Sequence, residues 1–269
     1  MAAVTTESLA AVQKELAPSL AQADLEVARE LFAVLDVLDS SAGLRRSLTD
    51  PSRDPQDRVA MARSLFGAKV RGTTTEVLDA LVSRRWSKER DLGDAVEILA
   101  VVVVVVQAER EGLAGLEKLE SALLDFRRTV ASSHQVQRAL TDAQATPEAK
   151  QKLAAQLSPG ASAEARLLID RAVTAPRGLR PAQLVERFTE QIAARQQRWI
   201  ALVTVAKELD PGYMQRLGAS LDRYFGRELK LDVVLDPAVV GGIRVQVGDE
   251  VVDSTVATKL NDLHRRLAS

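Results

Sequence analysis

Apolar side chains in the first two thirds of the chain recur at every third or fourth residue. The same 4-3-4 spacing occurs in two stripes, Val27, Leu31, Val34 and Leu38, and Leu119, Leu123, Phe126 and Val130. This spacing places the apolar side chains on one face of an α-helix. The pattern therefore predicts amphipathic helices over most of residues 1–195.

From Trp199 onward, apolar and polar residues alternate, which is typical of strands with one buried face. Residues 199–206 are predicted to form a strand, and Pro211 is expected to begin a helix. Alternate residues of two further strands are expected to face the core: Leu229, Leu231, Val233 and Leu235, then Ile243, Val245 and Val247. Residues 196–269 therefore read as a small α/β module.

The end of this module is predicted to contain a hairpin and a final helix. The pair Gly248 and Asp249 indicates a tight turn into a short return strand. Asp253 or Ser254 is expected to cap the helix, whose apolar stripe is Val256, Leu260, Leu263 and Leu267.

The helical part contains an internal repeat. When residues 40–66 are written above residues 132–158 without gaps, nine of the 27 positions are identical: Ser40/Ser132, Ser41/Ser133, Arg46/Arg138, Leu48/Leu140, Thr49/Thr141, Asp50/Asp142, Pro55/Pro147, Ala62/Ala154 and Leu65/Leu157. Composition alone would give roughly two or three identities. The repeat predicts two homologous helical bundles, residues 1–104 and 105–195, each containing a helix that begins with a capped proline.

Residues 98–106 form an unbroken apolar run that contains six consecutive valines. The run is too short to cross a membrane, which takes about 20 predominantly apolar residues. In the repeat, residues 96–106 align with residues 185–195, a segment with a helical pattern, so a helix is predicted despite the β-branched side chains. Because a helix that is apolar on all sides is usually buried on all sides, we expect this one to pack between the two bundles or against a partner helix.

Composition excludes several classes of protein. A net charge of −1 supplies no field for nucleic acid. The absence of cysteine excludes a disulfide framework and a thiolate metal site, and it suits a reducing compartment. The two histidines, His134 and His264, are too far apart in the chain to suggest a metal or catalytic cluster. No catalytic residue, cofactor or metal ion is predicted.

Residues 231–267 carry an ordered series of residue types: an acidic strand end, a glycine pair, alternating apolar residues with one base, a Gly-Asp turn and an aspartate before a helix. In this chain the series is Asp236, Gly241, Gly242, Ile243, Arg244, Val245, Gly248, Asp249 and Asp253. It resembles the C-terminal signature of the delta subunit of F-type ATP synthase, the family of the oligomycin-sensitivity-conferring protein. The second helical bundle makes the chain similar to the actinobacterial form of that family.

The resemblance implies a peripheral-stalk, or stator, subunit that is not an enzyme. In this family the N-terminal bundle receives the N-terminal helices of the alpha subunits, and the C-terminal module holds the b-type stalk subunits. The expected location is the cytoplasmic face of the cell membrane, without a span of the chain's own. Recognition of this kind places helices in apolar grooves.

The sequence leaves two alternatives open. A generic helical-repeat adaptor or scaffold would explain the duplication but would leave the C-terminal signature as a coincidence. An enzyme with a site between the bundles and the C-terminal module would need a cluster of titratable residues, which the sequence does not show. The duplication also leaves open which bundle performs the family's usual role.

Overall fold

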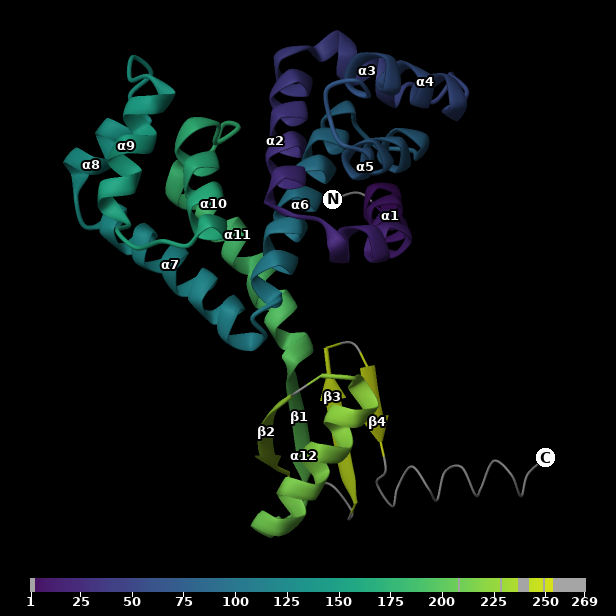
Figure 1. The fold of residues 1–269 in the computed structure, drawn as a ribbon, viewed down its shortest axis with the longest axis vertical. Coiled ribbons are helices and arrows are strands. Elements are labelled where there is room, and N and C mark those ends of the chain that lie inside the picture. Colours follow the sequence, from purple (N-terminus) through teal and green to yellow (C-terminus); the bar gives the residue numbers. More distant parts are fainter. Residues whose placement is uncertain (1–2, 208, 228, 237–241, 249, 254–269) are drawn as a thin grey trace. The chain divides into compact units, whose positions relative to one another are not determined.

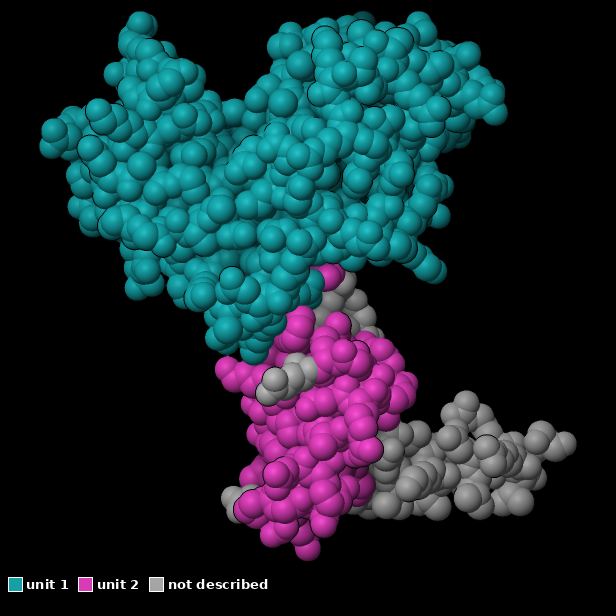
Figure 2. All heavy atoms as spheres, viewed as in Figure 1, with its two compact units in different colours: residues 1–191 teal, residues 192–269 magenta. Residues whose placement is uncertain are grey.

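The computed structural model describes residues 3–207, 209–227, 229–236, 242–248 and 250–253. This part of the chain is mostly helical, with a four-stranded mixed sheet near its C-terminal end (Figure 1), which confirms the predicted fold class. The chain divides into two compact units, residues 1–191 and residues 192–269 (Figure 2).

Eleven helices follow one another from the N-terminus: α1 (Ala3–Gln22), α2 (Leu25–Ser40), α3 (Ala42–Thr49), α4 (Pro55–Phe66), α5 (Gly72–Ser83), α6 (Glu89–Glu109), α7 (Leu113–Ala131), α8 (His134–Thr141), α9 (Pro147–Leu157), α10 (Ala163–Thr174) and α11 (Pro181–Gln196). The prolines that begin α4 and α9 follow the N-caps Asp54 and Thr146, as predicted. A capping side chain satisfies an N–H that the helix itself cannot pair, so the start of each helix is determined locally.

The repeated sequence produces repeated hydrogen bonds. Ser41 and Ser133 each accept a hydrogen bond from the backbone N–H three residues later. Thr49 and Thr141 each donate from the hydroxyl to the carbonyl oxygen four residues earlier, at 2.8 Å in both cases. The helices α2 to α5 thus have counterparts in α7 to α10, and side chains cap the starts of α3 and α4 as they cap the starts of α8 and α9.

The valine run lies within α6, so the predicted helix is confirmed. Val101, Val103 and Val104 have no exposed surface, and the next two valines are also buried. The helix contacts α1, α2, α3 and α5 of the first repeat and α7 and α10 of the second. The run therefore packs between the two repeats, as predicted. Among the described residues, no helix combines the length and the apolar character needed to cross a membrane.

The contacts of α6 explain why it is apolar on all sides. In the first repeat, α1 precedes α2 and contacts α5; in the second, α6 precedes α7 and contacts α10. Val12 and Leu16 of α1 are buried, and so are Val104 and Ala108 at the matching places of α6. Thus α6 closes the first bundle and also takes the place of α1 in the second. The position 104/105 lies inside this shared helix, and the division into two bundles there stays a prediction.

The second unit contains β1 (Ile200–Val205), α12 (Pro211–Phe225), β2 (Lys230–Leu235), β3 (Ile243–Val247) and β4 (Glu250–Asp253), preceded by the 3₁₀ turn η1 (Gln197–Trp199). The strand order is β2-β1-β3-β4. β2 runs parallel to β1, while β3 and β4 are antiparallel to their neighbours. One face of the sheet packs with α12 through a core of Ala201, Val203, Val205, Leu221, Leu229, Val245 and Val247.

The prediction for β2 is wrong in part. Leu231 packs against the core, but Val233 is 37% exposed and Leu235 is 50% exposed. These side chains share a face with the core because they pair with Val203 and Val205 of β1. The alternation of apolar and polar residues therefore predicted correctly which side chains share the core face of the sheet. The core itself does not reach the end of β2, so the last of these side chains are exposed. The predicted final helix lies outside the described residues.

Candidate docking surfaces

Several signature residues lie in β3 or directly beside it. Gly242 precedes β3 with φ of 85°, and Gly248 follows it with φ of 58°, conformations that side chains rarely adopt. Val245 is buried in the core, and Ile243 packs against it. Arg244 lies on the opposite face of β3 and is exposed.

The remaining signature residues lie at strand ends or outside the described part of the chain. The backbone N–H of Asp236 donates to the carbonyl oxygen of Val205 at 2.9 Å, which extends the pairing of β1 and β2. Asp253 ends β4 and is the register partner of Arg244. Gly241 and Asp249 lie outside the described residues. The described signature therefore builds the sheet, and a direct role in binding a partner stays a prediction.

The end of β2 presents an apolar surface. Val233, Val234 and Leu235 are all exposed, so both faces of this strand end are uncovered. Among the described strands, β2 is at the edge of the sheet. An edge strand offers backbone N–H and C=O groups as well as side chains to a partner. This strand end is the candidate docking surface of the second unit.

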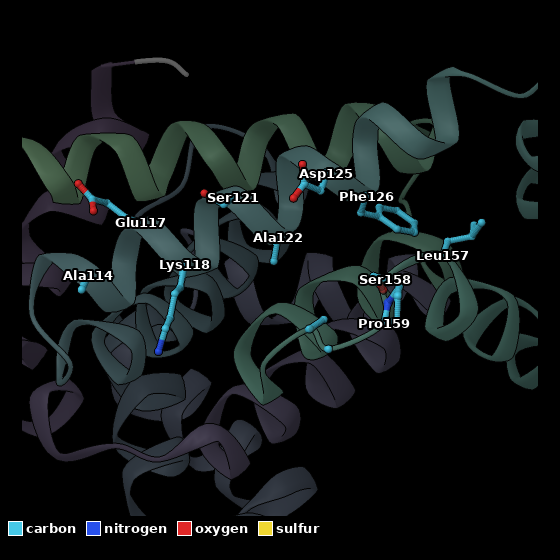
Figure 3. Close-up of a pocket in the computed structure, with 12 residues that line it drawn as sticks. Ala114, Glu117, Lys118, Ser121, Ala122, Asp125, Phe126, Leu157, Ser158 and Pro159 are labelled. Carbon is cyan, nitrogen blue, oxygen red and sulfur yellow. The ribbon is translucent and has the colours of Figure 1, made fainter.

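A groove of about 700 Å³ lies along α7 in the first unit (Figure 3). One side is formed by residues of α7: Ala114, Glu117, Lys118, Ser121, Ala122, Asp125 and Phe126. The other side is formed by Leu157, at the end of α9, and by residues 158–161 of the α9–α10 connection. Phe126 lies at the end nearest Leu157 and is fully buried, whereas Ala114 and Ser121 are exposed. The groove thus combines small and apolar side chains with the charged side chains of Glu117, Lys118 and Asp125.

In the first repeat, the corresponding position between α2 and the α4–α5 connection is filled by hydrogen-bonded polar side chains. There, Glu30 of α2 accepts hydrogen bonds from the backbone N–H of Arg71, at 2.9 Å, and from the hydroxyl of Thr74. In the second repeat, Ala122 stands in place of Glu30 and Ala165 in place of Thr74. Without these bonds, the connection before α10 is not tied to α7 in the same way.

A cluster of charged side chains lies where the two repeats meet. Arg177, between α10 and α11, pairs with Asp39 of α2 at 2.6 Å and with Asp94 and Glu97 of α6 at 2.8 and 3.1 Å. Burial raises the pKa of Glu97 above its ordinary value, and Arg177 opposes this shift. Burial would lower the pKa of Arg177, but its three carboxylate partners together raise it.

The cluster does not support the alternative of an enzyme. A perturbed carboxylate indicates a catalytic group when it lies in a cleft, but the residues around Arg177 do not line the groove along α7. Within the described residues, no three His, Asp or Glu side chains are placed to hold a metal ion. The cluster is a contact between two repeats, and the sequence analysis missed it.

Comparison with known proteins identifies the family. The sequence model of the ATP synthase delta (OSCP) subunit matches residues 100–267. The chain belongs to this family. ATP synthase subunit delta of Renibacterium salmoninarum is 53% identical over 270 residues, which cover 100% of both chains. The corresponding subunit of Pseudarthrobacter chlorophenolicus is 50% identical over 274 residues, again covering 100% of both chains.

Members of the delta (OSCP) family are non-catalytic structural subunits of ATP synthase and belong to its peripheral stalk, which confirms the predicted function and excludes the generic adaptor. The family match begins at residue 100, inside α6. The matched range therefore includes the C-terminal half of α6, the second repeat and the second unit, whereas most of the first repeat lies outside it.

Proposed function

We propose that this subunit ties the catalytic head of the ATP synthase to the b-type stalk at the cytoplasmic face of the cell membrane. In this role the head resists the torque of the rotor during proton-driven ATP synthesis. A tie of this kind must hold two partners at once. Membership in a peripheral-stalk family supports the role, and each compact unit of the chain carries a candidate docking surface.

The second repeat is the proposed site for an N-terminal helix of an alpha subunit. The observation that carries this assignment is the groove along α7, which lies in the part of the chain that matches the family. Small side chains such as Ala114, Ser121 and Ala122 allow a helix to approach closely. The apolar side chains of Leu157 and Pro159, on the other side of the groove, can be covered by its apolar face. The matching place in the first repeat is occupied by Glu30 and its partners.

The second unit is the proposed site for the b-type subunits. Val233, Val234 and Leu235 supply exposed apolar surface at a sheet edge. Burying such surface is favourable by roughly 25 cal/mol per Å². A stalk contact must also dissociate slowly, and slow dissociation depends on well-packed contacts more than on long-range charge.

Two substitutions in the full chain separate these assignments. Ala122→Arg places a long charged side chain in the groove, and we expect binding to purified catalytic heads to weaken at least about tenfold, or 1.4 kcal/mol. The matched control is Ala155→Arg, at an exposed position of α9 that does not line the groove. Unchanged binding by Ala122→Arg would show that the alpha helix docks elsewhere.

For the second unit, Leu235→Asp should weaken binding to b-type subunits while binding to catalytic heads stays normal. Gln215→Asp, at an exposed position of α12, adds the same charge and serves as its control. Surface plasmon resonance with each partner measures both effects. If Leu235→Asp bound the stalk normally, the end of β2 would not be the site.

A further inference from the structure

The junction between the repeats contains two arginines from the second repeat that pair with acids of the first. Arg171 of α10 donates to Asp36 of α2, and its guanidinium lies 5.1 Å from the ring centroid of Phe32 on the same helix. Arg177 pairs with Asp39, one turn further along α2, and with two acids of α6. The side chains of Arg171 and Arg177 are only 4% and 7% exposed.

The backbone at Arg177 is held in an unfavourable conformation. Its φ is 53°, and it is the non-glycine residue with positive φ in the described part of the chain. Such a conformation persists only where the surroundings determine it. The guanidinium also lies close to Gly93 of α6, where a Cβ atom would come within 3.0 Å of it. The positive φ of Arg177 and the absence of a side chain at Gly93 together allow the guanidinium to lie against the first repeat.

The two copies of the repeat show that these pairs belong to the junction. The counterpart of Asp36 in the second repeat is Arg128, and the counterpart of Arg171 in the first repeat is Ala80. Neither repeat can therefore form the Arg171–Asp36 pair within itself. The charges of this pair therefore stand at positions where the two copies differ.

We propose that Arg171 and Arg177 form a clamp that fixes the orientation of the second repeat relative to the first. Apolar packing along α6 holds the repeats together, but hydrophobic contact has little directional preference. Hydrogen-bonded ion pairs have defined distances and angles, and buried polar groups can specify one arrangement without adding stability. Figure 2 shows a notch between two lobes of the first unit, and the repeats contact each other through α6 with α7 and α10 and through α2 with α10.

The full chain allows a direct test because it contains no cysteine. Spin labels at Ala60→Cys on α4 and Ala155→Cys on α9 occupy exposed positions in the two repeats. Double electron–electron resonance then measures the distribution of distances between the labels. We expect one narrow distance in the parent chain and loss of that narrow peak with Arg177→Gln. The control Arg180→Gln removes the same charge at an exposed position in the same loop and should keep the peak.

A narrow, unshifted peak with Arg177→Gln, or a broad distribution in the parent chain, would overturn the clamp. Circular dichroism establishes whether the variant retains its helices. If it does not fold, Asp39→Asn decides the question, because it keeps the side-chain volume and removes one charge at the partly exposed edge of the cluster. Broadening with Asp39→Asn supports the clamp, and an unchanged peak overturns it.

Discussion

Because α6 belongs to two bundles, one buried valine in it should affect the stability of both. Val104→Ala removes two carbon atoms from a side chain with no exposed surface. At about 0.8 kcal/mol per buried carbon, the lost transfer free energy is about 1.6 kcal/mol. The cavity adds to this loss, while the better helix propensity of alanine offsets up to about 0.7 kcal/mol. We expect a net loss of about 1.5–2.5 kcal/mol in the free energy of unfolding.

Val102→Ala is the matched control, since it makes the same chemical change on the same helix at a position that is only partly buried. Its smaller transfer loss, about 0.8 kcal/mol if half the side chain is buried, is cancelled by the gain in helix propensity. The expected change is therefore close to zero. Since both variants change helix propensity equally, the difference between their free energies of unfolding reports the effect of burial alone.

Urea unfolding of the full chain measures both changes. Far-UV circular dichroism follows all helices, while the fluorescence of Trp86, which is buried in the first repeat, follows that repeat. Replacement of Trp199 by phenylalanine removes the other tryptophan. We expect Val104→Ala to shift the fluorescence transition and most of the circular dichroism transition together, since ten of the described helices lie entirely in the first unit. Equal destabilisation by Val102→Ala, or a shift of the fluorescence transition while most of the circular dichroism transition stays in place, would refute the shared helix.

Two further predictions concern a backbone conformation and a buried carboxylate. Gly242→Ala should destabilise the second unit by roughly 1–2 kcal/mol because φ is 85°; Gly43→Ala, which meets open space, is the control in thermal melts. Burial raises the pKa of Glu97 in the folded state above its ordinary value of 4.5, so the parent protein loses stability as pH rises through this range and its buried carboxyl group ionises. The Glu97→Gln variant has no such group, so its free energy of unfolding should increase relative to that of the parent over the same range. Parallel stability curves for the two proteins over this range, measured by urea unfolding, would contradict the second prediction.

Much of the helical fold could be predicted because its determinants are local. The caps Asp54 and Thr146, each followed by proline, fix helix starts within a few residues. The valine run has no helical periodicity of its own, and its alignment with a helical segment of the second repeat is what predicted a helix. Burial in β2 could not be predicted in the same way. Alternation places Val233 and Leu235 on the core face, but only the extent of the packing shows that they are uncovered.

The charged junction could not be predicted from periodicity because its partners are far apart in the chain. Arg177 and Asp39 are 138 positions apart, and no spacing rule joins such residues. A signal was nevertheless present in the differences between the copies. Glu30 is replaced by Ala122 at the groove, and Asp36 by Arg128 near the junction. Most aligned positions also differ between the copies, so the structure was needed to show which of these differences accompany a contact or an open surface.

A shared helix and a set of directional ion pairs would together make the tandem bundles suitable for a stator. If α6 alone joined the repeats, torque on one bundle could rotate it about that helix while most of the apolar contact survived. Such rotation would separate Arg177 from its three carboxylate partners and leave two nearly buried charges, those of Arg177 and Glu97, without their ion pair. Breaking one partner of a buried pair commonly costs about 3–5 kcal/mol. The resistance to rotation would then arise from the penalty for displacing the charges, even where the pairs add little to the stability of the resting fold.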